Sequence, residues 1–240
     1  MPEPPTPEEV MTINAARGLR DGEVCLVGVG PPNAAVNLAR RLHAPDCVLV
    51  YESGAIGSKP ARLPLSIGDD DLAETADAIV SVPEMFNYWI GGGRIDVGFL
   101  GAAQIDRQGQ INTTVIGDYG TPKVRLPGAG GAPEIASSAR RVMALLRQSP
   151  RTFVAELDFT TSTSDPPGPD ARPMQVITDL GILKRDAGDG ELVLTALHGA
   201  TTVEEAVEAT GWELRAVAEP QRTPAPTDEE LETLRELRAR

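Results

Sequence analysis

The chain has 240 residues, 41% of them hydrophobic and 24% charged, which is enough for one α/β domain with a sizeable core. A formal net charge of −13 argues against nucleic acid or an anionic membrane as the partner. No apolar run approaches the roughly 20 residues of a membrane-spanning helix, and the N-terminal segment does not have the pattern of a signal peptide.

The N-terminal segment is predicted to be a short arm followed by a helix. Residues 1–7 hold four prolines and are expected to form a flexible arm. Thr6 and Glu9 have the spacing of a capping box, Pro7 suits the first helical turn, and Gly22 is the predicted end of the helix.

Two valine-rich apolar runs, residues 23–30 and 46–52, are too short for helices and are predicted to be buried strands. The segment between them, residues 31–45, reads as a helix, so the three pieces form a β–α–β unit with parallel strands. Each run holds one cysteine, Cys25 or Cys47, which favours reduced, buried thiols over a disulfide or a metal site. Cysteine usage and the N-terminal pattern together suggest the cytoplasm.

Strands and helices continue to alternate through the rest of the chain. The expected elements are a strand at 77–82, a glycine-capped helix at 83–93, strands at 94–106 and 140–146, a strand pair at 174–183 and 191–198, a helix capped by Thr202, and an exposed terminal helix with Asp228 near its start. This order predicts the α/β class, with an open, mostly parallel sheet and helices on both faces. The expected organisation is one domain over residues 8–220, followed by a proline spacer and C-terminal helix over residues 221–240.

The first candidate site is the glycine turn GVGPPN, residues 28–33, between the first predicted strand and the following helix. Such a turn meets the pyrophosphate in dinucleotide-binding folds, and Glu52, 22 residues after Gly30, has the spacing of a ribose-binding acid. Asn33, however, replaces the third glycine, and the two prolines before it lack amide donors. A plain tight turn is therefore favoured over a cofactor site, and a helix start that lines an active-site crevice is the middle option.

The second candidate is Glu52 itself, where the apolar strand stops and Ser53 and Gly54 turn the chain. At the carboxyl end of a central parallel strand, this carboxylate would face the crevice in which α/β sheets bind ligands. There it is able to attack an activated acyl carbon. A plain turn residue explains the position equally well.

Two further segments are candidates for binding. In residues 126–137, the successive amides around Gly128, Gly130 and Gly131 are able to form an anion nest or an oxyanion site, with a flexible surface loop as the alternative. In residues 101–114, small residues follow an apolar strand, and Gln104 and Asn112 are predicted to be structural or substrate-contacting amides.

Several chemistries are poorly supported by the sequence. It has neither the G-x-S-x-G nucleophile elbow nor the G-x-x-x-x-G-K-[ST] phosphate loop. His43 and His198 are expected to have surface or capping roles, and neither has metal-ligand spacing to a cysteine, so no metal site is predicted.

Taken in order, these pieces resemble the class I CoA-transferases, most closely the β-type subunit of glutaconate CoA-transferase. The resemblance covers roughly residues 8–217 and rests on the segments GVGPPNAAVNLARRLHAPD, YESGAIG, GRIDVGFLGAAQIDRQGQINTT, PGAGGAPEIASS, FTTS and TALHGATTVEEAVEATGWEL. It implies an open α/β sheet of the ribose-phosphate-isomerase-like kind. It also implies an α-type partner subunit, as αβ or α2β2, with the active site between the two subunits.

For the chemistry, the resemblance implies that Glu52 is the nucleophile and forms a glutamyl-CoA thioester. Coenzyme A would be a substrate, with no tightly bound cofactor, and the acceptor would be a small carboxylate or dicarboxylate. The residues implied to contact substrate or CoA are Gly30, Asn33, Ser53, Gly54, Gly101, Ala102, Gln104, Asn112, Gly128, Gly130, Gly131 and Ala132.

The sequence departs from the family pattern at Pro133–Glu134, where many members have a small or amide residue followed by an aspartate; the proline removes one amide donor beside the glycine turn. Relatives on the same fold catalyse hydrolysis or decarboxylation, and their β-type subunits typically lack the glutamate. Acyl-CoA hydrolase or decarboxylase is therefore the first alternative function. A nucleotide-cofactor-binding module and a non-catalytic scaffold subunit are the others.

Overall fold

The structure, a computed structural model, describes residues 3–163, 165–166, 168 and 170–239. The chain divides into two compact units. Unit 1 comprises Met1–Phe99, Ser138–Arg140 and Ala225–Arg240, and unit 2 comprises Leu100–Ser137 and Arg141–Pro224. Residues 1–2 of the predicted arm and residue 240 of the predicted terminal helix lie outside the described residues.

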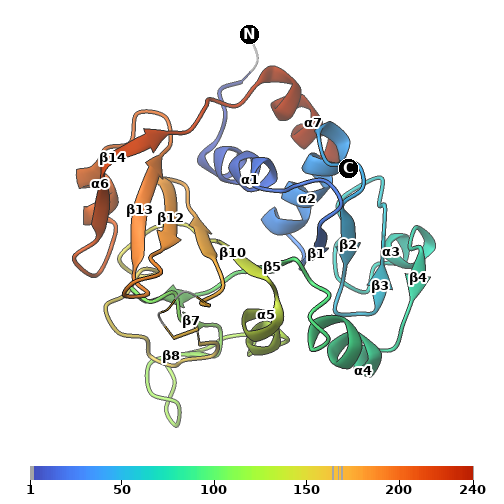
Figure 1. Ribbon diagram of the computed structural model, residues 1–240, viewed down its shortest axis with the longest axis horizontal. Helices are drawn as coiled ribbons and strands as arrows, with labels where there is room; N and C mark the ends of the chain where they lie inside the picture. Colours follow the sequence, from blue (N-terminus) through green and yellow to red (C-terminus); the bar gives the residue numbers. More distant parts are fainter. Residues whose placement is uncertain (1–2, 164, 167, 169, 240) are drawn as a thin grey trace. The chain divides into compact units, whose positions relative to one another are not determined.

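Unit 1 contains a sheet whose strands lie in the order β5-β1-β2-β3-β4 (Figure 1). Strands β1 (Val24–Leu26), β2 (Val48–Val50) and β5 (Val97–Leu100) are parallel, while β3 (Ala55–Ile56) and β4 (Ala78–Ile79) add antiparallel strands at one edge. Helix α2 (Pro31–Leu42) connects β1 to β2, so the predicted β–α–β unit is confirmed. Both cysteines are buried in this unit, as predicted.

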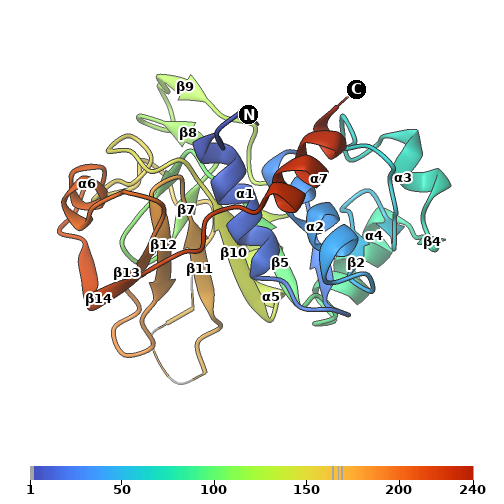
Figure 2. The ribbon, with the colours of Figure 1, turned by 90° about the horizontal axis from the view of Figure 1, so that it is seen from above.

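Three helices of unit 1 pack against one another: α1 (Pro7–Arg17), α2 and α7 (Asp228–Arg238), as Figures 1 and 2 both show. The capping box of Thr6 and Glu9 is present, but α1 ends at Arg17 with Gly18 as its cap, before the predicted Gly22.

The prediction of an exposed terminal helix is wrong. Leu231, Leu234 and Leu237 of α7 are buried, because the three leucines lie on the side of the helix that meets the rest of unit 1. Arg17 donates two hydrogen bonds of 2.7 Å to Glu230, and Arg235 pairs with Glu9. Helix α7 therefore belongs to unit 1 rather than forming a separate appendage.

The remaining helices of unit 1 are short. They are α3 (Asp70–Glu74), α4 (Val82–Glu84) and the π-helix η1 (Met85–Ile90). A helix is present where one was predicted at residues 83–93, and it ends at Gly91. Its second part, η1, is a π-helix rather than an α-helix. The Gly91 amide donates to the Phe86 carbonyl at 2.8 Å, five residues back, which is the π pattern.

The main strands of unit 2 are β10 (Arg141–Leu145), β11 (Met174–Ile177), β12 (Gly181–Arg185), β13 (Leu192–Leu197) and β14 (Arg215–Arg222). The pairs β10–β11 and β13–β14 are parallel, whereas β11–β12 and β12–β13 are antiparallel. The segment 174–183, predicted as one strand, is a hairpin, because Thr178 donates its amide to the Gly181 carbonyl at 2.9 Å and closes a turn.

Unit 2 also carries smaller elements around these strands. Two short hairpins pair β6 (Gln104–Ile105) with β7 (Ile111–Asn112), and β8 (Val115–Ile116) with β9 (Val124–Arg125); the helices are α5 (Ala132–Ser138) and α6 (Val203–Glu208). Thr202 caps α6 through a capping box, as predicted. In the described part of the chain, no helix is both long and apolar enough to cross a membrane.

His198 is not the surface or capping histidine expected from the sequence. It is 3% exposed, and its ring nitrogens lie 2.8 Å from the Thr223 hydroxyl and 3.0 Å from the Thr178 carbonyl. It is a structural residue of unit 2, whereas His43 follows α2 at its C-terminal end, as expected.

Candidate active site

Glu52 lies in a tight turn immediately after strand β2 in unit 1. The Tyr51 amide donates to the Ala55 carbonyl at 3.0 Å, and the Gly54 amide donates to the Tyr51 carbonyl at 2.9 Å. Glu52 and Ser53 are held between these two bonds and are partly exposed, while Tyr51 is fully buried. The turn therefore fixes the backbone of Glu52 and leaves its side chain at the surface of unit 1.

Gly54 and Gly57 lie where no side chain could fit without a steric conflict. Gly54 has a φ of 106°, and a Cβ on it would lie 2.0 Å from the Val80 carbonyl oxygen. At Gly57, with a φ of 69°, a Cβ would lie 2.3 Å from the Asp77 carboxylate. The two glycines therefore allow the residues on either side of β4 to approach the Glu52 turn and the end of β3 closely.

The start of α2 lies behind this turn. Gly30 is the N-cap residue of α2, with a φ of 86° and open space around it. Asn33 is only 1% exposed, and its side-chain amide donates to the Tyr51 hydroxyl at 2.7 Å. The structure thus brings Asn33 close to the Glu52 turn. The side-chain amide of Asn33 is buried and hydrogen-bonded to Tyr51, so it does not lie at the surface.

In unit 2 the predicted amide residues Gln104 and Asn112 hydrogen-bond to each other. The Asn112 side-chain amide donates to Gln104 Oε1 at 2.7 Å and to the Val115 carbonyl at 2.6 Å. Gln104 in turn donates to the Asp158 carboxylate at 2.9 Å. Both side chains are buried and hydrogen-bonded within the protein. This favours a structural role over contact with the substrate, the other role predicted for them. Gly101 and Ala102, just before them, are exposed or partly exposed.

The glycine turn of unit 2 is partly occupied by its own hydrogen bonds. Gly128 and Gly130 have positive φ values of 108° and 51°. The Gly128 amide donates to the Thr113 carbonyl at 3.0 Å, and the Ala132 amide donates to the Ala129 carbonyl at 3.0 Å. These two amides are therefore committed within the chain. Gly131 accepts the first bond of α5, from Ile135.

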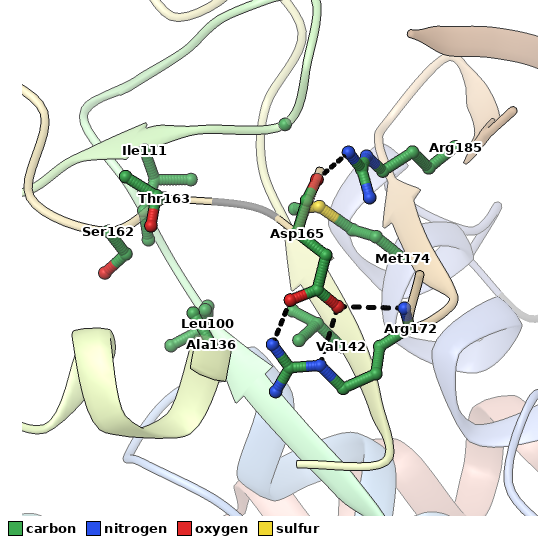
Figure 3. Close-up of a pocket in the computed structure, with 11 residues that line it drawn as sticks. Leu100, Ile111, Ala136, Val142, Ser162, Thr163, Asp165, Arg172, Met174 and Arg185 are labelled. Atoms are coloured by element: carbon green, nitrogen blue, oxygen red, sulfur yellow. Dashed lines mark hydrogen bonds and ion pairs between the residues drawn. The ribbon is translucent and has the colours of Figure 1, made fainter. Parts of the chain in front are cut away.

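A small cavity, missed by sequence reasoning, lies within unit 2 (Figure 3). It holds about 20 Å³ of space for the centres of water molecules, room for about one water. Its described lining is Leu100, Gly109, Ile111, Ala136, Val142, Ser162, Thr163, Asp165, Arg172, Met174 and Arg185. None of these belongs to the predicted site set.

An ion pair closes one side of this cavity. Figure 3 shows the Arg172 side chain folded back on Asp165, with the Nε–carboxylate distance at 2.7 Å. The hydrogen bond from Arg172 lowers the pKa of Asp165. Arg185 donates to the backbone carbonyl of Asp165 and to that of Gly190. Ser162, also in the lining, has a buried hydroxyl without a hydrogen-bond partner among the residues that the structure describes.

The predicted site residues therefore form two sets. One set lies around the Glu52 turn of unit 1 and consists of Gly30, Asn33, Glu52, Ser53 and Gly54. The remaining predicted residues lie along the β6–β7 hairpin and in the glycine turn of unit 2. Sequence reasoning missed Tyr51 and Val80, which hold the Glu52 turn. Tyr51 lies next to the candidate nucleophile in the sequence, but its partner Asn33 is 18 residues away.

Comparisons with known proteins agree with the sequence resemblance. The family model described as Coenzyme A transferase matches residues 9–209. The B subunit of the 3-oxoadipate CoA-transferase of Pseudomonas knackmussii is 57% identical over 97% of this chain and 93% of that protein. The B subunit of the glutaconate CoA-transferase of Acidaminococcus fermentans is 32% identical over 87% of this chain and 84% of that protein.

Solved structures give the same answer for the fold. The glutaconate CoA-transferase of Acidaminococcus fermentans superimposes with a TM-score of 0.90 at 31% identity, covering 98% of this chain and 95% of that one. The decarboxylase AibA/AibB superimposes with a TM-score of 0.86 at 29% identity, over 97% and 95% of the two chains. The predicted α/β fold of the CoA-transferase kind is confirmed. The chain belongs to the coenzyme A transferase family, as an enzyme subunit similar to the B subunits of 3-oxoadipate and glutaconate CoA-transferases.

Proposed function

We propose that this chain is the catalytic β-type subunit of a heteromeric CoA-transferase, with Glu52 as the nucleophile. The observation that carries the proposal is the Glu52 turn, in which a partly exposed glutamate lies one residue beyond β2 and two hydrogen bonds close the backbone around it. Its residues, Glu52, Ser53 and Gly54, match the E-S-G turn that carries the nucleophile in the family.

The proposed reaction has four steps, which transfer CoA without net hydrolysis. The Glu52 carboxylate attacks the acyl-CoA carbonyl, the CoA thiolate leaves, and a mixed anhydride forms. The thiolate then attacks the glutamyl carbonyl, which gives a glutamyl-CoA thioester and releases the donor acid. The acceptor carboxylate attacks this thioester and again forms an anhydride. The released thiolate finally attacks the acceptor acyl carbon, which yields the new acyl-CoA and restores Glu52.

The proposed acceptor is a small dicarboxylate. The first compound to test is 3-oxoadipate, because the name of the relative at 57% identity contains it.

Enzymes of this family use CoA as a substrate, and no tightly bound cofactor is part of the proposed mechanism. The B-subunit relatives support an α-type partner, which we propose completes the site and excludes water from the anhydride. The cytoplasm is the proposed location, supported by the two cysteines, which are buried in unit 1 as thiols.

The test is an assay of the complex formed with the co-expressed α-type subunit. An acyl-CoA donor is incubated with and without 3-oxoadipate or glutaconate, and free CoA and new acyl-CoA are measured. Transferase activity predicts that new acyl-CoA appears only with the acceptor, and that Glu52→Gln abolishes it. Ser66→Ala, an exposed change in unit 1 outside the proposed site, is the matched control and is expected to be fully active.

Decarboxylation or hydrolysis is the second candidate, favoured by the superposition with the decarboxylase AibA/AibB. Either activity would consume acyl-CoA without an acceptor, releasing carbon dioxide or free CoA. The same assay therefore separates the candidates: consumption that is independent of the acceptor and survives Glu52→Gln would replace the transferase proposal with one of these.

A further inference from the structure

The Glu52 turn is closed on one residue, Tyr51. The Tyr51 amide bonds the Ala55 carbonyl at 3.0 Å and its carbonyl accepts from the Gly54 amide at 2.9 Å, so both ends of the turn meet at the Tyr51 backbone. A change in the backbone conformation of Tyr51 would also move Glu52, the next residue in the chain. The backbone of Tyr51 therefore holds the turn in which Glu52 lies.

The Tyr51 side chain is anchored by a buried polar network on helix α2. Asn33 donates to the Tyr51 hydroxyl at 2.7 Å. Asn37 donates to Asn33 Oδ1 at 2.7 Å and to the Asn33 carbonyl at 3.0 Å. All three residues are at most 3% exposed. The hydrogen bonds therefore run in series from Asn37 through Asn33 to Tyr51.

The Tyr51 hydroxyl is an uncharged member of this network. Burial raises the pKa of Tyr51 to about 12, so the hydroxyl stays neutral at physiological pH. A phenylalanine would fill the same apolar space, and burying polar groups stabilises the fold only modestly even when they are satisfied. Satisfied buried networks instead restrict groups to one arrangement. What the network provides is a fixed orientation for the residue that closes the Glu52 turn.

We propose that Tyr51 and Asn33 are positioning residues for Glu52, acting as one unit through the 2.7 Å hydrogen bond between them. They hold the turn so that the carboxylate meets the thioester carbon in the geometry of attack. The inference rests on the proposed function, because it requires Glu52 to be the nucleophile. It assigns Asn33 a role behind the turn instead of the contact with substrate that the family resemblance implied.

The experiment measures the rate of glutamyl-CoA formation in the assembled α–β complex. After rapid mixing with acyl-CoA, the thioester is trapped with borohydride at a series of times and the reduced Glu52 is quantified by mass spectrometry. Tyr51→Phe is expected to slow trapping about 10- to 100-fold, with KM for acyl-CoA changed less than about threefold, because a small misplacement of a reacting group has an effect of this size. Thr178→Val is the matched control: it removes a buried, hydrogen-bonded hydroxyl of unit 2 and is expected to leave the rate unchanged.

Asn33→Ala tests whether the two residues act together. It is expected to slow trapping as much as Tyr51→Phe does, and the double variant is expected to be no slower than either single one. Asn33→Ala also serves as the test if Tyr51→Phe does not fold. Trapping at the wild-type rate in a folded variant would overturn the positioning role. Absence of trapping in the wild-type complex would instead overturn the proposed function, so the two failures are distinct.

Discussion

The Val80 amide donates to the Gly54 carbonyl at 3.0 Å, which joins the segment after edge strand β4 to the turn that carries Glu52. The approach is so close that a Cβ on Gly54 would lie 2.0 Å from the Val80 carbonyl oxygen. The candidate nucleophile is thus held from two sides in unit 1, by Tyr51 at the end of β2 and by Val80.

This relationship predicts that Gly54→Ala strongly destabilises the protein. The substitution introduces both a steric conflict with Val80 and strain at a φ of 106°, so a loss of about 3 kcal/mol is expected in urea denaturation. Gly22→Ala is the control, since Gly22 has a φ of 77° but nothing within 4 Å, and a loss of about 1 kcal/mol is expected. Equal losses in the two variants would contradict the close approach to Val80.

Asn112→Ala is expected to reduce stability rather than substrate binding. The change leaves the amides of Thr114 and Val115 without their side-chain acceptor, and a loss of about 2–4 kcal/mol follows for these buried groups. The check is urea denaturation together with KM for acyl-CoA, with the exposed Gln108→Ala as control. A large rise in KM at unchanged stability would show instead that Asn112 contacts the substrate.

The ion pair between Glu9 and Arg235 predicts a loss of stability in acid. The Arg235 hydrogen bond lowers the pKa of Glu9 from 4.5 to about 2, so between these values the unfolded chain binds the proton more readily than the folded one. Stability from this pair is therefore present above about pH 4.5 and is lost as the pH falls toward 2, by at most about 3 kcal/mol.

Arg235→Met is expected to flatten this part of the pH profile of unfolding, measured by denaturation at several pH values. The matched control is Arg215→Met, whose ion pair with Asp189 is exposed and contributes little. An unchanged slope in Arg235→Met would show that Glu9 is not the responsible group.

Two buried hydroxyls of unit 2 are expected to respond in opposite directions. Ser162→Ala removes a buried hydroxyl that has no hydrogen-bond partner in the described part of the chain, and it is predicted to be neutral or to stabilise by up to about 1 kcal/mol. Thr178→Val removes bonds to Gln148 and Gly181 and is predicted to cost about 2 kcal/mol. Thermal or urea unfolding measures both, and a large loss in Ser162→Ala would show that its hydroxyl has a hydrogen-bond partner.

Local signals are sufficient to predict much of the fold. The capping box at Thr6, the proline start of α2 and the valine runs of β1 and β2 depend on neighbours in the sequence, and each lies where it is expected. The order of these elements, together with the motif at the Glu52 turn, is also sufficient to indicate the coenzyme A transferase family from the amino-acid sequence.

The errors arise where distant contacts decide the structure. The sequence predicts that helix α7 is exposed, because its partners Glu9 and Arg17 lie more than 200 residues away along the chain. In the candidate site, the residues that hold Glu52 are not recognisable from the sequence, since the Tyr51 hydroxyl finds Asn33 only after α2 has packed on the sheet. Gln104 and Asn112 are ambiguous for the same reason, because their mutual hydrogen bond depends on the β6–β7 pairing.

The central claim, that Glu52 is the nucleophile, is tested most directly by trapping the glutamyl-CoA thioester. The complex with its α-type subunit is incubated with acyl-CoA, treated with borohydride or hydroxylamine, digested, and analysed by mass spectrometry. The proposed mechanism predicts a modification on Glu52 that requires acyl-CoA. The modification is expected to be lost when an excess of acceptor carboxylate is added before the borohydride or hydroxylamine, because the acceptor consumes the thioester. An unmodified Glu52, together with transferase activity that persists in Glu52→Ala, would contradict it.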